Sequence, residues 1–279
     1  MLYLILAIAS SAMVSVFMRI SEGKVKYNIA MLVSNYLMCS ILAGVFSGTG
    51  IRGILLPQLG ITAALGTVNG GLYLGAFLLL QRNVRDNGVV LSTTFMKLGL
   101  LVTLAVSVFV YGEVPALLQV LGTGIALTAI LLINGRDTES GTGKDRLGLL
   151  WLLLCGGMAD AMSKVFAESG VPGLESLFLL FTFATALIFC IACMLAKGQR
   201  LGKWELLFGL LVGVPNFFSS QLLLRALEEL AAVMVYPVYS VGGILTVTVV
   251  GVLLFRERLT RRQWLALGLI LAALVLLNL

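Results

Sequence analysis

The sequence contains no histidine, and only 11% of its residues are charged. Soluble domains are nearer to a quarter charged. A chain with 59% hydrophobic residues therefore cannot hide its apolar surface in a single water-soluble core. Without histidine or a cluster of acids, the sequence also lacks the nucleophile-and-base or metal-ligand sets of an enzyme. We predict a protein that is not an enzyme, with no catalytic residues, no metal and no cofactor.

Other signals are equally sparse. The four cysteines lie inside apolar segments, and the C-x-x-C pair Cys190 and Cys193 has no second pair, which favours apolar packing over a redox or zinc site. No basic region precedes the first apolar run, so we expect a retained first helix rather than a signal peptide. A G-x-x-x-x-G-K-[ST] motif is absent, which excludes ATP as a direct fuel. The basic residues form no continuous face, so nucleic acid is not an expected partner.

Long apolar stretches dominate what remains. A membrane-spanning helix needs about 20 mainly apolar residues. Ten stretches meet this requirement, at approximately 2–20, 28–47, 58–81, 88–111, 115–134, 147–168, 173–196, 203–226, 231–255 and 261–278. The fold class predicted is an all-α integral membrane protein with ten transmembrane helices. The polar segment 135–146 divides the chain almost in half and is predicted to be a linker.

The two halves resemble each other. When residues 91–134 are shifted forward by 144 positions, twelve identities result, including Glu113/Glu257, Gln119/Gln263 and Gly124/Gly268. A shift of 147 pairs Gly66 and Asn69 with Gly213 and Asn216. We interpret residues 1–134 and 147–279 as two five-helix repeats. Glu113 and Glu257 are assigned structural work at helix ends.

The distribution of Lys and Arg predicts the orientation of each half. Of nineteen such residues, fifteen lie in alternate connections, and the other connections hold only Arg52 and Arg225. Positive connections stay in the cytoplasm, which places both chain ends outside. The charged connections follow different helices in the two halves. Similar halves with opposite charge bias must insert in opposite directions, so the repeats are predicted to be inverted.

Each half closes in the same way, with a long apolar helix, an acidic residue and a final helix that contains Gln and Gly. These ends read Tyr111-Gly112-Glu113 with Gln119 and Gly124, and Phe255-Arg256-Glu257 with Gln263 and Gly268. The pattern resembles the ten-helix EamA-type branch of the drug/metabolite transporter superfamily. That resemblance implies inverted repeats around a central cavity and transport by alternating access. It also implies substrates such as amino acids, sugar phosphates, choline-like cations or toxic organic compounds.

Charges inside apolar helices are the sharpest functional candidates, because each costs a few kcal/mol in hydrocarbon. Lys97 lies near the middle of the stretch 88–111 and is a candidate cavity cation, with a fixed interhelical ion pair as the alternative. Asp160 and Lys164 share one helical face, which allows a local ion pair. Asp160 is alternatively a contact for a substrate amine, a coupling site or the partner of Lys97. Without histidine, a proton relay has to use Asp160 or another carboxylate.

Polar and helix-breaking residues in three further helices complete the predicted site. Asn69 and Tyr73 lie in a glycine-rich helix, and Asn216 follows Pro215, which frees a backbone carbonyl. Plain helix packing is the alternative to substrate contact there. Pro237 separates Tyr236 from Tyr239 and is a candidate hinge, as is Pro215. The alternative for Pro237 is an inert kink.

These features favour a secondary transporter for a small polar metabolite, an amino acid or related compound, in the cell membrane of a prokaryote. Lys97 and Asp160 would hold the two ends of a zwitterion. An exporter of drugs or quaternary-ammonium cations is an alternative that requires Lys97 to be paired away from the cavity. A lipid or polyprenyl-phosphate flippase is an alternative of another class. Expected partners are the substrate, membrane lipids and a coupling proton or sodium ion, in a monomer or weak dimer.

Overall fold

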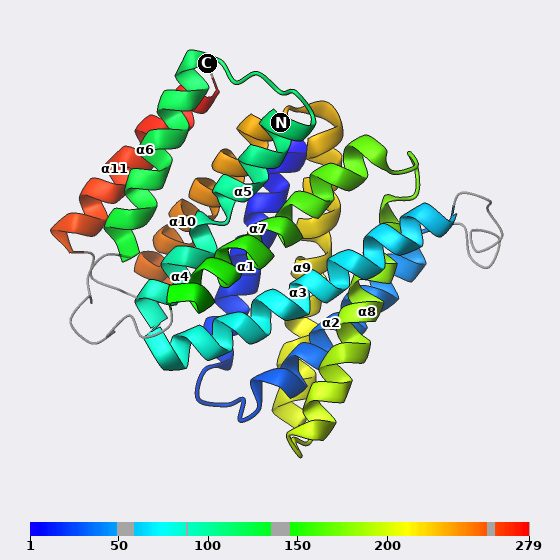
Figure 1. The fold of residues 1–279 in the computed structure, drawn as a ribbon. Coiled ribbons are helices and arrows are strands. Elements are labelled where there is room, and N and C mark those ends of the chain that lie inside the picture. The colour runs from blue at the N-terminus through cyan, green and yellow to red at the C-terminus, as the bar shows by residue number, and fades with distance from the viewer. Residues whose placement is uncertain (49–58, 88, 135–145, 256–259, 279) are drawn as a thin grey trace. The chain divides into compact units, whose positions relative to one another are not determined.

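The computed structural model describes residues 1–48, 59–87, 89–134, 146–255 and 260–278. All regular structure in these ranges is helical, which confirms the predicted all-α class. The elements, shown in Figure 1, are α1 (Leu2–Ser21), α2 (Asn28–Phe46), α3 (Leu59–Asn87), α4 (Val89–Leu98), α5 (Leu100–Ala105), the π-helix η2 (Val106–Val110), α6 (Leu117–Asn134), α7 (Arg146–Ser169), α8 (Glu175–Ala196), α9 (Lys203–Glu229), α10 (Ala232–Phe255) and α11 (Arg261–Leu277). The predicted linker at 135–146 lies outside the described residues, except for Arg146, where α7 begins.

Spanning length is the main property that these helices share. Eight helices in the described part of the chain are long and apolar enough to cross a membrane, and one of these spans, Ser92–Val110, combines residues of α4, α5 and η2. The apolar segment of α6 is shorter, at Leu117–Leu132, and α11 has 17 residues. The chain is therefore a multi-pass membrane protein. Several of its helices extend into polar residues beyond the apolar runs, as α3 does up to Asn87.

The first of two compact units comprises residues 1–74 and 162–228. In this unit α2 and α8 pack along each other, and the rings of Tyr36 and Phe183 stack between them with centroids 6.2 Å apart. Glycines let two further helices approach this pair closely. A Cβ atom at Gly66 of α3 would lie 2.6 Å from the carbonyl oxygen of Phe178 in α8. A Cβ atom at Gly213 of α9 would lie 2.7 Å from the carbonyl oxygen of Asn35 in α2.

The second compact unit comprises residues 75–161 and 229–279. Here α6 and α11 run side by side over a core of small and branched apolar residues, and a Cβ atom at Gly122 would lie 2.9 Å from Leu277 Cγ. In both helices a glutamine of the first turn bonds back to the backbone of the residue before the helix. The backbone N–H of Ala116 donates to Gln119 Oε1 at 3.1 Å, and that of Thr260 donates to Gln263 Oε1 at 2.8 Å. These bonds satisfy backbone donors that the first turn of a helix leaves free.

Candidate functional site

The two predicted charges, Lys97 and Asp160, lie near a close crossing of α4 and α5 with α7. Gly99 and Gly157 meet at the crossing, where a Cβ atom on Gly157 would overlap the carbonyl oxygen of Gly99 and lie 2.6 Å from Val102 Cβ. Thr103 Oγ1 also donates to the Gly157 carbonyl oxygen at 3.3 Å. The two glycines thus let the backbones touch. Because Lys97 precedes Gly99 by two residues and Asp160 follows Gly157 by three, the crossing also sets the spacing of these charges.

The helix that contains Lys97 is interrupted at this point. α4 ends at Leu98 and α5 begins at Leu100, and the N–H of Gly99 bonds to the carbonyl of Met96, three residues back rather than four. A short tightened turn of this kind often marks a functional hinge. The predicted helix at 88–111 is therefore divided into α4, α5 and η2. The division follows from the glycine, whose missing side chain weakens the helix while it allows the close crossing.

Lys97 and Asp160 are the charged pair of this site. Both side chains are exposed, and the ammonium of Lys97 lies near enough to the Asp160 carboxylate for their charges to interact. An exposed charge within a spanning helix must face water, a ligand or a partner, since hydrocarbon is too costly for it. Tyr236 of α10 is buried, and its hydroxyl donates to the backbone carbonyl oxygen of Asp160 at 2.9 Å. The site therefore contains both signs of charge and a phenol from a third helix.

α10 continues as a helix through Pro237, and this proline is buried. Tyr239 is half-buried on the following turn. Of the predicted residues, Lys97, Asp160, Tyr236, Pro237 and Tyr239 all belong to the unit of residues 75–161 and 229–279. This unit accordingly contains both charges that are predicted to bind substrate, Lys97 and Asp160.

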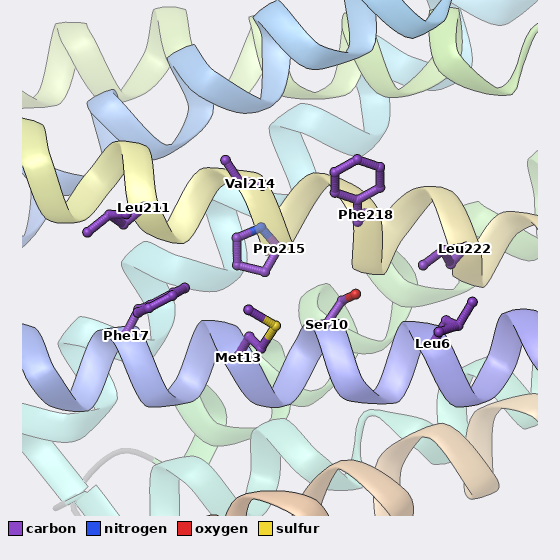
Figure 2. A pocket seen from close by; sticks show the side chains of 9 residues that line it. All are labelled: Leu6, Ser10, Met13, Phe17, Leu211, Val214, Pro215, Phe218 and Leu222. Carbon is purple, nitrogen blue, oxygen red and sulfur yellow. The ribbon is translucent and has the colours of Figure 1, made fainter.

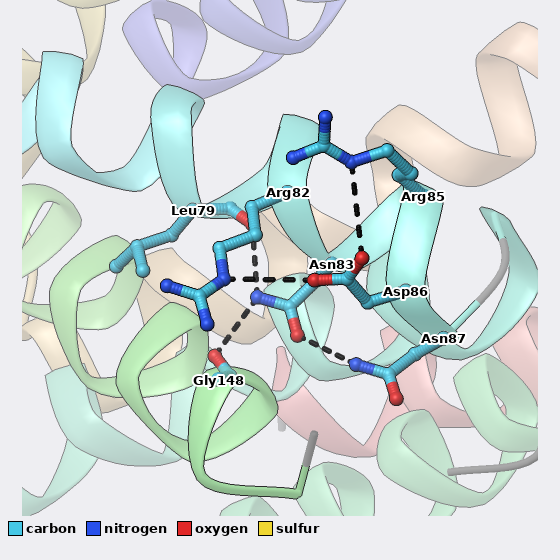
Figure 3. A network of polar contacts seen from close by, with 7 residues as sticks. All are labelled: Leu79, Arg82, Asn83, Arg85, Asp86, Asn87 and Gly148. Carbon is cyan, nitrogen blue, oxygen red and sulfur yellow. Dashed lines mark hydrogen bonds and ion pairs between the residues drawn. The ribbon is translucent and has the colours of Figure 1, made fainter. Parts of the chain in front are cut away.

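A polar network fixes the far end of α7, the helix that carries Asp160 (Figure 3). The amide of Asn83 in α3 donates to the carbonyl oxygen of Leu79 at 2.9 Å and to that of Gly148, in the first turn of α7, at 3.0 Å. Asn87 donates to Asn83 Oδ1 at 2.9 Å, and both asparagines are buried. Figure 3 also shows Arg82 and Arg85 reaching Asp86 on the exposed side of α3, at 3.5 Å and 3.8 Å. The Asn83–Gly148 bond holds the start of α7 against α3, and the exposed ion pairs of Asp86 take no part in that contact.

The amide residues of the prediction belong to the other unit. Asn69 is buried in α3, and its Nδ2 donates to Thr182 Oγ1 of α8 at 3.4 Å, whereas its Oδ1 has no hydrogen-bond partner among the described residues. Asn216 is half-buried in α9, and its Nδ2 donates to Asn35 Oδ1 of α2 at 3.3 Å. These contacts are interhelical amide bonds. Tyr73 is half-buried on the turn of α3 that follows Asn69.

Two more predicted residues, Pro215 and Lys164, belong to this unit. Pro215 is buried inside α9, which continues past it, and the nearby Gly213 carbonyl accepts from Cys39 Sγ at 3.3 Å. Lys164 of α7 is buried and forms an ion pair with Glu168 one turn later. The glutamate is 44% exposed, so the pair extends from the buried ammonium toward the surface. A structural ion pair therefore accounts for Lys164.

The sequence prediction missed several partner groups. Asn35 and Thr182 bind the two predicted asparagines, and Glu205 accepts from the backbone N–H groups of Lys26 at 2.9 Å and Tyr27 at 3.3 Å. A polar residue in the middle of an apolar helix was the available signal for Asn35 and Thr182. Its partner depends on which helices pack together. Within the described ranges, no group of three or more Cys, Asp and Glu side chains is placed to hold a metal ion.

Comparisons with known proteins give a family and a fold. Residues 146–279 match the EamA-like transporter family. The chain is 24% identical to an uncharacterized protein of Haemophilus influenzae over 203 residues. The aligned region covers 71% of this chain and 69% of that protein. A protein of known crystal structure is similar over all of this chain and 97% of its own, with a TM-score of 0.73 and 16% identity. At that identity the match shows the fold alone. The family match agrees with the family that the repeated helix ends predict.

Proposed function

From the match of residues 146–279 to the EamA-like transporter family, we propose that the chain is a secondary transporter that moves a small polar metabolite across a prokaryotic cell membrane. The proposed substrate class is an amino acid or a related zwitterion. One observation carries the proposal. Lys97 and Asp160, exposed in spanning helices, lie within electrostatic reach of each other and offer opposite charges to a single ligand. The ammonium would bind a substrate carboxylate, and the carboxylate would bind a substrate amine.

The same observation separates this proposal from export of a quaternary-ammonium cation. Such a substrate carries a positive charge without an anionic group, so a lysine next to the binding carboxylate would repel it. An exporter of that kind requires Lys97 to be paired away from the cavity, whereas Lys97 is exposed and within electrostatic reach of Asp160. A zwitterion instead uses both groups. In the absence of histidine, Asp160 is also the group we assign to proton or sodium coupling.

Alternating access by two inverted five-helix repeats is the proposed mechanism. Contacts within the unit of residues 1–74 and 162–228 support it. Asn69 donates to Thr182, and Asn216 donates to Asn35. The two donors are 147 positions apart in the sequence, and so are the two acceptors, Asn35 and Thr182. The first repeat thus binds the second at the same positions at which the second binds the first. That reciprocity is expected when two repeats are related by a two-fold axis.

The other unit supplies a second line of support for the repeats. Ala116 and Thr260 are 144 positions apart, as are Gln119 and Gln263, and the glutamine caps the following helix in both halves. The interruption at Gly99 and the prolines Pro215 and Pro237 are the proposed hinges, since each locally weakens helical hydrogen bonding. Movement at these points would open the site to one side of the membrane at a time.

Transport by the purified protein in liposomes tests the proposal. Thermal-shift screening against amino acids, choline-like cations and phosphorylated metabolites first selects a ligand, and its radiolabelled form is then used for uptake. Lys97→Ala and Asp160→Asn should each reduce uptake at least about ten-fold, because a lost hydrogen bond to a charged group costs about 1.5 kcal/mol or more. Arg85→Gln removes an exposed cation of the same unit and serves as the control. Full uptake by both site variants would refute the assignment.

A further inference from the structure

An apolar groove runs between α1 and α9 in the unit of residues 1–74 and 162–228, which does not contain the charged pair (Figure 2). Its volume is about 360 Å³. At one end it lies between Phe17 and Leu211, and at the other between Leu6 and Leu222. Eight of its nine lining side chains are apolar, and Ser10 is the exception. Such a lining offers almost nothing to a polar metabolite.

The length of the groove corresponds to one leaflet of a membrane. From Leu211 to Leu222 the α9 helix rises about 16 Å, at about 1.5 Å per residue. One leaflet of hydrocarbon is about 15 Å thick, which is half of the roughly 30 Å core. An acyl chain that lies along α1 and α9 would therefore fill the groove from end to end. The apolar side chains Leu6 and Leu211 are 43% and 40% exposed, so the groove is open to a chain entering from the side.

The Phe17 end of the groove leads to a basic corner. Lys24 lies in the connection after α1, and its Nζ is 5.5 Å from the ring centroid of Trp204 and 5.4 Å from that of Phe208 in α9. Phe208 is one turn from Leu211, so the ammonium lies just beyond the end of the groove. Trp204 is 49% exposed, as is usual for an indole at a membrane interface.

The basic corner, formed by Lys24, Lys26 and Lys203, is fixed by hydrogen bonds and has a net positive charge. The buried Glu205 carboxylate accepts from the N–H groups of Lys26 and Tyr27, which ties the connection bearing Lys24 to the start of α9. Glu22 is paired with Arg19 at 2.8 Å. The two acids thus have partners in the fold, and the exposed ammonium groups of Lys24, Lys26 and Lys203 remain to attract an anion.

We propose that this groove and corner form a binding site for one anionic phospholipid, with its phosphate at Lys24 and an acyl chain along α1 and α9 between Phe17 and Leu222. Lysines at the membrane surface attract anionic headgroups, and the apolar groove holds the chain. By the charge distribution of the connections, the lipid belongs to the cytoplasmic leaflet. Transport of a substrate is not required for this site. The bound lipid would hold α1 against α9, in addition to the Ser219–Ala7 hydrogen bond of 3.2 Å that joins these helices.

Native mass spectrometry of the full chain, released from bilayers with equal amounts of phosphatidylglycerol and phosphatidylcholine of the same acyl chains, tests the proposal without any substrate. The wild type should retain phosphatidylglycerol in preference to phosphatidylcholine. Lys24→Gln should lower retention of phosphatidylglycerol about five-fold, as expected for one lysine, and leave phosphatidylcholine unchanged. Ser10→Phe, which fills the groove, should lower retention of both lipids. Arg225→Gln, an exposed cation elsewhere on α9, should behave as the wild type.

Equal retention of the two lipids by the wild type would overturn the headgroup assignment, and wild-type retention by Lys24→Gln would do the same. Wild-type retention by a folded Ser10→Phe protein would overturn the groove. Because the Lys24 side chain is exposed, its variant should fold normally and is decisive even if Ser10→Phe does not fold. A protein that fails to transport amino acids but retains phosphatidylglycerol in this pattern would refute the proposed function and leave the lipid site intact.

Discussion

At the scale of single residues, Glu113 shows how an acid that ends one helix stabilises the start of another. Its two carboxylate oxygens accept from the backbone N–H groups of Ala232 at 3.0 Å and Val233 at 2.9 Å, in the first turn of α10. An anion at a helix N-terminus satisfies free donors and interacts favourably with the helix dipole. The structural role predicted for Glu113 is thereby confirmed, and Glu257 lies outside the described residues.

We expect Glu113→Ala to lower the free energy of unfolding by about 1–2 kcal/mol, because it removes a cap with two hydrogen bonds. Thermal unfolding of the purified protein in detergent measures the change. Glu22→Ala is the control, since Glu22 is exposed and its ion pair with Arg19 lies at the surface. Equal stability of the two variants would contradict a capping role for Glu113.

The residues that could be predicted from the sequence are those whose environment is set by their own helix. Lys97 and Asp160 are conspicuous because a charge within an apolar stretch needs a reason to be there. The spacing predicts an ion pair of Lys164 with Asp160, four residues before it, whereas the structure pairs Lys164 with Glu168, four residues after it. Asn35 could not be assigned as the partner of Asn216, because 181 residues separate them and only helix packing brings them together.

At the scale of helices, the positions of the helices could be predicted from the sequence, but the break within one of them could not. Long apolar runs predict helices because lipid leaves the backbone no other way to satisfy its hydrogen bonds. They do not reveal that Gly99 separates α4 from α5, since that depends on the approach of Gly157 from α7. Helix ends were underestimated where polar residues continue the helix. The end of α3 is one example, where Asn83 bonds to the Gly148 carbonyl and supports the additional turns.

The crossing of α5 with α7 leads to a prediction that uses two adjacent glycines. A Cβ atom at Gly157 would collide with the Gly99 carbonyl and Val102, whereas a Cβ atom at Gly156 would meet nothing within 4 Å. Gly157→Ala should force the helices apart, lower the unfolding temperature by several degrees and weaken ligand binding, because Lys97 and Asp160 lie on either side of the crossing. Overpacking of this kind costs about 1–3 kcal/mol.

Gly156→Ala is the matched control, and it should retain or slightly raise stability, since alanine is the better helix former. Thermal unfolding with and without the ligand selected in the transport screen measures both effects. If the two alanine variants were equally stable and bound the ligand equally well, the crossing would not position the charged pair.

At the scale of the whole chain, packing and sequence similarity divide the protein at different places. Similarity divides it at the polar segment 135–146, whereas each compact unit takes residues from both halves, 1–74 with 162–228 and 75–161 with 229–279. The first boundary can be read from repeated residues such as Gln119 and Gln263. The second arises because α3 and α7 each pass from one unit into the other, between Leu74 and Gly75 and between Ala161 and Met162. Nothing in an apolar helix of uniform composition marks such a passage.

The charge distribution predicts how the whole chain lies in the membrane. Fifteen of the nineteen Lys and Arg residues occupy alternate connections, and the central segment 135–146 is one of these connections. That segment should therefore face the cytoplasm, and both chain ends should lie outside. A reporter fused to each end, and the variant Ser140→Cys in a background without the four native cysteines, can be labelled with an impermeant reagent in intact cells. The ends should label and position 140 should label only after the cells are opened. Five spanning helices in each half would place each chain end and position 140 on opposite faces of the membrane, because five is an odd number of crossings. Labelling of the ends and position 140 from the same face would therefore contradict the five-helix halves and the inversion, and with them the alternating-access mechanism proposed here.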